Sequence, residues 1–117
     1  MLEPLRKHTD IILSWRITRY EQYGASLRLR MEITFIDSSK LLVRETVLEG
    51  KERKYAYHWQ SGEGKPLVRW DNAPHWDIET APHHKHDGTT NAVEPSYQRT
   101  LDQVLDVIDL ELRRNKE

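Results

Sequence analysis

The segment Leu-Arg-Leu-Arg-Met-Glu-Ile-Thr-Phe, residues 27–35, alternates strictly between apolar and polar side chains. A repeat of two is typical of a β-strand with one face in the core and the other in water. We therefore predict a strand here, with Arg28 and Arg30 on its solvated face. Together with Arg44, these arginines are interpreted first as ordinary surface charges and second as a patch for nucleic acid or a protein partner.

Weaker versions of this alternation flank the segment, within residues 11–17, 41–48, 53–60 and 67–71. The intervals between them carry turn-forming residues: Gly24, Asp37, Gly50, Gly62 and Gly64. Consecutive strands joined by short turns favour an antiparallel meander. We predict about five strands between residues 11 and 71, after a polar lead-in over residues 1–10.

The pattern changes to a helical one at Thr100. Thr100 and Gln103 have the spacing of a capping box, in which each side chain bonds the backbone N–H of the other residue. Apolar residues then recur at helical spacing: Leu101, Val104, Leu105, Ile108 and Leu112. The expected fold class is α+β, with an antiparallel β-meander and a C-terminal helix over about 100–114 packed on one face, in a single domain spanning residues 1–117.

Composition excludes several classes of protein. The chain has no cysteine, which rules out disulfides, thiolate metal sites and a cysteine nucleophile. Its net charge of −1 means that any nucleic-acid site must be a local patch. No apolar run approaches the length of a membrane span, and the start lacks the apolar core of a signal peptide. We expect a cytoplasmic protein without membrane contact.

Residues 69–88, RWDNAPHWDIETAPHHKHDG, concentrate four of the six histidines: His75, His83, His84 and His86. Pro74 and Pro82 restrict the backbone within this segment, so we predict an ordered histidine-rich loop over residues 71–88. Residues 87–98 are polar and irregular. Ordered loops on a rigid scaffold commonly carry binding and catalysis.

Two histidines can act as general base and general acid together, because imidazole titrates near neutral pH. A nearby cation completes a metal-free recipe for RNA cleavage. The pair predicted for acid–base chemistry is His84 and His86, with Lys85, Arg69 and Asp71 at the RNA phosphate. His58, His75 and His83 are further catalytic candidates. We expect His83, His84 and His86 to line one cleft together with at least one of His58, Arg69, Asp71 or His75.

Other interpretations stay open at this point. His84 and His86 could bind a divalent metal such as zinc, completed by Asp71, Asp77, Asp87 or His75, although the spacing matches no established metal motif. No cofactor is required by the acid–base hypothesis. The loop could also be a surface loop whose imidazoles only bond the backbone, and Arg69 and Asp71 could simply pair with each other.

Four blocks of the chain resemble the TumE family of toxins from toxin–antitoxin pairs: residues 55–60 (YAYHWQ), 69–75 (RWDNAPH), 82–86 (PHHKH) and 100–105 (TLDQVL). The resemblance covers roughly residues 10–110. Two positions depart from the family pattern, Trp76 where a second histidine often stands and Ala81 where an aromatic residue often stands.

The resemblance implies a small toxin neutralised by a helix-turn-helix antitoxin. Combined with the histidine chemistry, it leads us to expect a metal-independent endoribonuclease with RNA as substrate. The alternative is a non-catalytic module whose histidine loop grips a partner or a metal ion. A homodimer is compatible with either reading.

Overall fold

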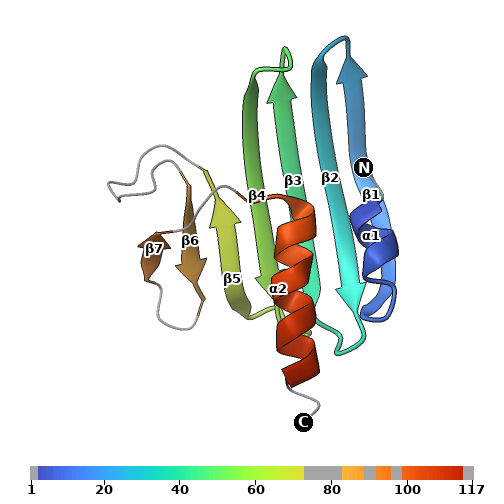
Figure 1. The fold of residues 1–117 in the computed structure, drawn as a ribbon, viewed down its shortest axis with the longest axis vertical. Helices are drawn as coiled ribbons and strands as arrows, with labels where there is room; N and C mark the ends of the chain where they lie inside the picture. The colour runs from blue at the N-terminus through green and yellow to red at the C-terminus, as the bar shows by residue number, and fades with distance from the viewer. Residues whose placement is uncertain (1–2, 73–82, 89–91, 96–98, 115–117) are drawn as a thin grey trace.

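The computed structural model describes residues 3–72, 83–88, 92–95 and 99–114. Its elements follow the order α1 (Glu3–Lys7), β1 (Ile12–Tyr23), β2 (Ser26–Phe35), β3 (Lys40–Leu48), β4 (Glu52–Gln60), β5 (Pro66–Asp71), β6 (His84–Asp87), β7 (Val93–Pro95) and α2 (Leu101–Arg114). Within the described ranges the strands form one seven-stranded sheet in the order β1 to β7, and every neighbouring pair is antiparallel (Figure 1). The predicted α+β meander is confirmed.

One face of this sheet is the core. Its strands contribute apolar side chains at alternate positions, including Met31, Ile33, Phe35, Tyr57 and Trp70, all of them at most 2% exposed. The stripe of α2 packs onto them, with Val104, Leu105 and Ile108 fully buried. Burying such a side chain stabilises the fold by about 1.5–3 kcal/mol. The alternation seen in the sequence therefore sets which face meets the helix.

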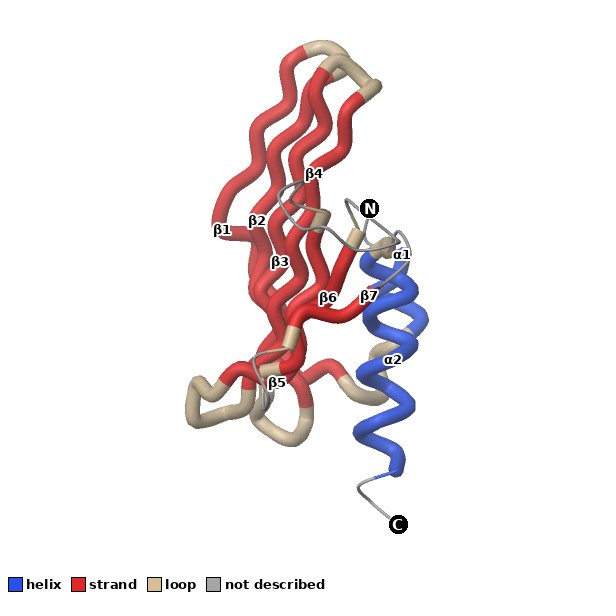
Figure 2. Tube along the Cα trace, turned by 90° about the vertical axis from the view of Figure 1, so that its left-hand side faces the viewer, coloured by secondary structure: helices blue, strands red, loops and turns tan. Residues whose placement is uncertain are grey.

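The other face of the sheet is not covered by a helix. In Figure 2 both described helices lie on the same side of the sheet, and β1 to β4 extend past them. We call the uncovered side the open face; the arginines at even positions of β2 lie on it. Because a half-covered sheet must be polar on its second face, this arrangement explains the charged alternate residues.

The N-terminus of α2 has the predicted capping box. The backbone N–H of Gln103 donates to Thr100 Oγ1 at 3.3 Å, and the N–H of Thr100 donates to Gln103 Oε1 at 3.1 Å. Asp102 in the first turn and Arg113 and Arg114 in the last turn complement the helix dipole. The helix begins at Leu101, as the capping spacing indicates.

Three elements differ from the sequence expectation. Residues 3–7 form the short helix α1 instead of a polar lead-in, anchored by buried Leu5. The predicted loop 71–88 contains the strand β6, and the polar stretch after it contains β7. Both strands are held by backbone pairing with their neighbours. A four-residue polar segment such as His84–Asp87 has no alternation of apolar and polar residues from which a strand could be predicted. Residues 73–82 of the predicted loop lie outside the described residues.

No helix within the described residues is long and apolar enough to cross a membrane.

Candidate functional site

The open face carries a row of arginines that lie opposite one another on adjacent strands. Arg30 on β2 pairs in register with Arg19 on β1 and with Arg44 on β3. The neighbouring row runs from Arg28 on β2 to Lys54 on β4 across Thr46. Like charges placed directly opposite across strands are destabilising. The fold therefore keeps these cations together at a cost in stability, which points to a role beyond solubility.

These cations are largely uncompensated. The acidic groups of the open face already have partners, since Glu32 pairs with Arg16 and Glu21 pairs with Arg19. Among the described residues that line a depression on this face, four cations have no ion pair: Arg28, Arg30, Arg44 and Lys54. The depression, of about 510 Å³, lies over them and reaches Arg69 and Asp71 on β5. The open face is thus a concave, positively charged surface.

Asp71 lies at the end of this surface nearest β6, where it contacts two other side chains. It is a buried carboxylate, 4% exposed, at the last position of β5. Its Oδ2 lies 3.1 Å from Arg69 Nε and 3.5 Å from His86 Nε2. A buried carboxylate requires such partners to offset its lost hydration. Asp71 therefore fixes the orientation of both Arg69 and His86.

His58 completes a row of three residues across β4, β5 and β6. In the antiparallel register His58 lies opposite Arg69, and Arg69 lies opposite His86. The three side chains line a hollow of about 190 Å³, together with Pro66 and Gly88 among other residues. Among the described residues, His58 Nε2 is buried and has no hydrogen-bond partner. Burial, and secondarily the Arg69 charge, lower the pKa of His58, so its imidazole is neutral at physiological pH.

Strand alternation divides the predicted histidine site between the two faces. His83 leaves the open face, and its Nδ1 lies 2.9 Å from Tyr55 Oη with the two rings stacked 5.9 Å apart. Lys85 pairs in register with Trp70, on the helix-covered side, so it does not share a face with Arg69. Position 84 pairs in register with Asp71. His75 lies outside the described residues.

The structure therefore brings together His58, Arg69, Asp71 and His86, and it separates His83 and Lys85 from them. The reason is the period of two along residues 83–86, which a loop assignment does not contain. The pairing of Arg69 with Asp71, one of the alternatives that the sequence left open, is present.

A second polar network, not foreseen from the sequence, lies beside His83. Arg53 Nη2 donates to Glu45 Oε1 at 2.9 Å, to Tyr57 Oη at 2.6 Å and to the carbonyl of Arg99 at 2.8 Å. Its guanidinium also lies 4.5 Å from the Tyr55 ring centre. Burial, followed by the neighbouring Glu45 carboxylate, raises the pKa of Tyr57. The only sequence signal was the shared parity of Tyr55 and Tyr57, which indicates a common face but no contacts.

Comparison with known proteins identifies the family of the chain. The model of the family described as Toxin TumE matches residues 1–112, nearly the full length of the chain. No curated protein and no solved structure is significantly similar to the chain.

Proposed function

The chain belongs to the TumE family, toxins of toxin–antitoxin systems, and from this premise we propose that it binds RNA on the open face and cleaves it at His58 and His86. The observation that carries the proposal is the row of opposed arginines leading to the Asp71-held pair of Arg69 and His86. Protein cations that replace counterions along a nucleic-acid backbone supply most of its non-specific affinity.

Binding would use the four uncompensated cations and the depression above them. Single-stranded RNA follows positively charged grooves, and each phosphate contact releases counterions. Binding of phosphates between Arg30 and Arg44 would also relieve their mutual repulsion. The open face thus supplies the positive charge for RNA binding, and RNA binding would explain why the opposed arginines are retained despite their repulsion.

The chemistry follows from the row His58–Arg69–His86. His58, a neutral imidazole, would take the proton of an RNA 2′-hydroxyl while that oxygen attacks the adjacent phosphorus. His86, with Asp71 as its counterion, would give a proton to the departing 5′-oxygen. The products would be a 2′,3′-cyclic phosphate and a free 5′-hydroxyl. Arg69 would stabilise the charge that develops on the phosphorane oxygens.

The other catalytic candidates keep subordinate places. His84 is two positions from His86 on β6. It remains the alternative to His58 as the acid–base partner of His86, as predicted from the sequence. His75 stays a candidate without a structural assignment. Lys85 and His83 would act on the RNA only if the substrate also reached the helix-covered side, and we expect them to contribute less than Arg69 and His86.

The expected partner is an antitoxin, as the family implies. We propose that it is a helix-turn-helix protein that neutralises the toxin by covering the open face, and that the toxin acts in the cytoplasm without a catalytic metal. Homodimerisation is compatible with this proposal. A dimer formed through β1, an edge strand of the sheet, would leave the open face accessible.

The decisive experiment compares RNA cleavage and growth arrest for wild type, His86→Ala and His58→Ala, with Lys65→Ala as control. Lys65 lies in the loop between β4 and β5; its side chain is 78% exposed, pairs with Glu63 and does not line the hollow at His58 and His86. Cleavage in EDTA by wild type and the control, with loss in both histidine variants, is expected. If the histidine variants still arrest growth and RNA stays intact, the toxin acts by binding, as the non-catalytic alternative holds.

A further inference from the structure

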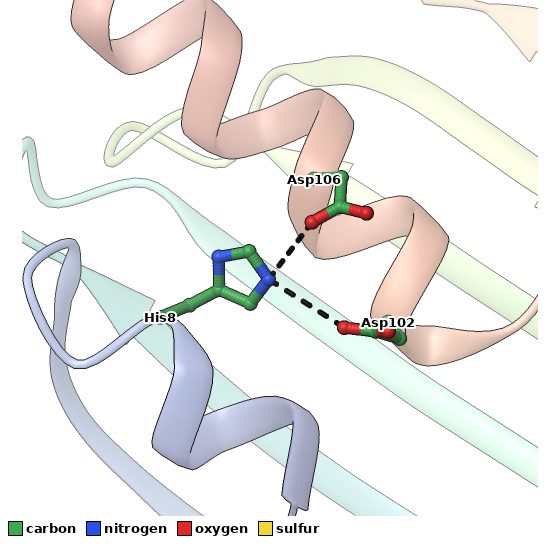
Figure 3. A group of neighbouring side chains, drawn as sticks. All are labelled: His8, Asp102 and Asp106. Carbon is green, nitrogen blue, oxygen red and sulfur yellow. Dashed lines mark ion pairs between the residues drawn. The ribbon is translucent and has the colours of Figure 1, made fainter.

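A second cluster of chemically capable side chains lies on the opposite side of the sheet, between the two helices. His8 directly follows α1, and its side chain is 7% exposed. Its imidazole points at α2, where Asp102 and Asp106 face it from consecutive helical turns (Figure 3). Asp109 lies one further turn along the same helix, so the three carboxylates share one face of α2.

The distances place both ring nitrogens of His8 among carboxylate oxygens. Nδ1 lies 2.9 Å from Asp109 Oδ2, whereas Nε2 lies 3.1 Å from Asp106 Oδ1 and 3.7 Å from Asp102 Oδ1. One ligand atom from each of His8, Asp102 and Asp106 lies within 4.8 Å of the other two. A metal ion bound by three protein ligands needs such a spacing, because each bond is about 2.0–2.2 Å long.

The second oxygens of Asp102 and Asp109 are already engaged. Lys7 Nζ lies 3.2 Å from Asp102 Oδ2, and Arg113 pairs with the second oxygen of Asp109. Asp102 Oδ1 and His8 Nε2, which face each other, are buried and have no hydrogen-bond partner among the described residues. The two atoms therefore converge on one point, while Lys7 and Arg113 contact other oxygens of the cluster.

The tautomer of His8 explains what this point requires. Asp109 accepts only if Nδ1 carries the proton. In the neutral imidazole this leaves the lone pair of Nε2 directed at two carboxylates, whereas in the imidazolium Nε2 would carry a proton facing Asp106. Acceptors facing acceptors in a buried site are costly. A cation between them satisfies all three. The contact of Asp109 with the far nitrogen is also the outer-shell contact found at histidine-bound metals, where it fixes the ring and raises its basicity.

We propose that His8, Asp102 and Asp106 bind a divalent transition-metal ion, with Asp109 as the positioning residue for His8. One imidazole and two carboxylates suit Zn²⁺ better than Mg²⁺ or Ca²⁺, which prefer all-oxygen sites. The ion would join α1 to α2 and hold both against the sheet, on the side away from His86. This site is independent of the proposed RNA chemistry and differs from the histidine-loop metal considered in the sequence analysis.

The test measures Zn²⁺ binding by the full-length protein after chelation and dialysis, using calorimetry and melting temperature, with Mg²⁺ as a second probe. We expect one Zn²⁺ per chain, a higher melting temperature with Zn²⁺ and little response to Mg²⁺. Asp106→Asn should weaken binding at least about tenfold without unfolding the chain, because this side chain is 66% exposed. Glu111→Gln, on the same helix but paired with Arg114, is the matched control and should bind like wild type.

Two further variants locate the ion. Asp109→Asn should lower affinity by about 10–100-fold, as loss of an outer-shell partner does. His84→Ala combined with His86→Ala should leave Zn²⁺ binding unchanged. The proposal is overturned if wild type shows no Zn²⁺ dependence, if Asp106→Asn binds as tightly as Glu111→Gln, or if binding disappears with the loop histidines. The proposal is also overturned if the NMR signals of His8 show a doubly protonated ring that does not change on addition of Zn²⁺. That result would identify a cluster held by ion pairs alone.

Discussion

Arg69 Nε lies 3.1 Å from Asp71 Oδ2, and the two residues stand two positions apart on the same face of β5. The pair is asymmetric, because the Asp71 side chain is 6% exposed whereas that of Arg69 is 49% exposed. The aspartate is thus the fixed member, and the guanidinium keeps donors available towards the open face. His86 contacts the same Asp71 oxygen from β6 at 3.5 Å.

The first prediction concerns Asp71→Asn. The substitution keeps the volume and removes the charge that orients Arg69 and His86. We expect a loss of about 1.5–3 kcal/mol in the free energy of unfolding, the range for hydrogen bonds to charged groups, and a larger loss of RNA cleavage. Urea unfolding and a cleavage assay measure the two effects. Unchanged cleavage in a folded Asp71→Asn protein would show that this carboxylate does not position the site.

The second prediction concerns Arg30→Ala, which should lower RNA affinity without lowering the stability of the fold. Arg30 stands between Arg19 and Arg44, so its removal relieves repulsion, and we expect stability to stay level or rise by about 0.2–1 kcal/mol. RNA affinity should fall, and the slope of log affinity against log salt should decrease by about one. Filter binding at several salt concentrations measures both.

Arg16→Ala is the matched control for Arg30. Arg16 lies on the same face, but its guanidinium is 2.7 Å from Glu32 and is therefore already neutralised. Its loss should leave the salt dependence of RNA binding near the wild-type value. Equal effects of the two substitutions would mean that the face binds RNA only through general charge, or not at all.

The strands and the helix could be predicted because their residues repeat with one period over a long stretch. Residues 27–35 repeat every two positions and Leu101–Leu112 every three or four, and burial acts on each residue in the same way. The same parity placed Arg69 and Asp71 on one face. The cluster around His8 could not be predicted, because its partners lie about a hundred positions away and only the packing of α1 on α2 joins them.

The division of the histidines was missed for a different reason. Residues 83–87 are polar throughout, so no contrast between apolar and polar side chains reveals a strand. Only the backbone pairing with β5 gives β6 its alternation, which sends His83 to Tyr55 and His86 to Asp71. Short polar strands of this kind carry little signal in a single sequence.

The third prediction is a pH dependence set by His58. Its pKa is lowered in the folded chain by burial and by Arg69, so the unfolded chain binds the proton more readily. Stability should therefore fall as pH drops through the ordinary value of about 6.5 towards the lower folded pKa. Urea midpoints at pH 7.5 and 5.5 should differ more for wild type than for His58→Gln. An equal difference in both proteins would assign the pH dependence to other groups.

The fourth prediction concerns Gly88→Ala. A Cβ atom at this position would lie 2.1 Å from the backbone oxygen of Pro66, so β6 would have to move away from β5. The bond from the Gly88 N–H to the Leu67 carbonyl, 2.8 Å long, would be disturbed. We expect destabilisation of about 1–3 kcal/mol and loss of cleavage, because His86 is two residues away.

Gly64→Ala provides the comparison for Gly88. Gly64 has a φ of +85°, so alanine is strained there, but no atom lies within 4 Å of the added Cβ. It should lower the melting temperature without changing cleavage at a temperature where the protein is folded. If Gly88→Ala and Gly64→Ala behave alike, stability alone explains the loss, and the closure of β5 onto β6 has no part in the site.

The last prediction compares His86 with His83, which stand three residues apart on different faces. His86→Ala should lower the rate of RNA cleavage by about 10²–10⁴-fold, the contribution of an acid–base residue, and should therefore prevent growth arrest. Its effect on melting temperature should be moderate, because Asp71 loses one partner but keeps its closer contact with Arg69. His83→Ala should do the reverse, because it removes a hydrogen bond and a stacked ring at Tyr55, costing about 0.5–1.5 kcal/mol. If His83→Ala instead abolishes cleavage in a folded protein, the reaction takes place beside Tyr55 and Arg53, and the open face serves only to bind.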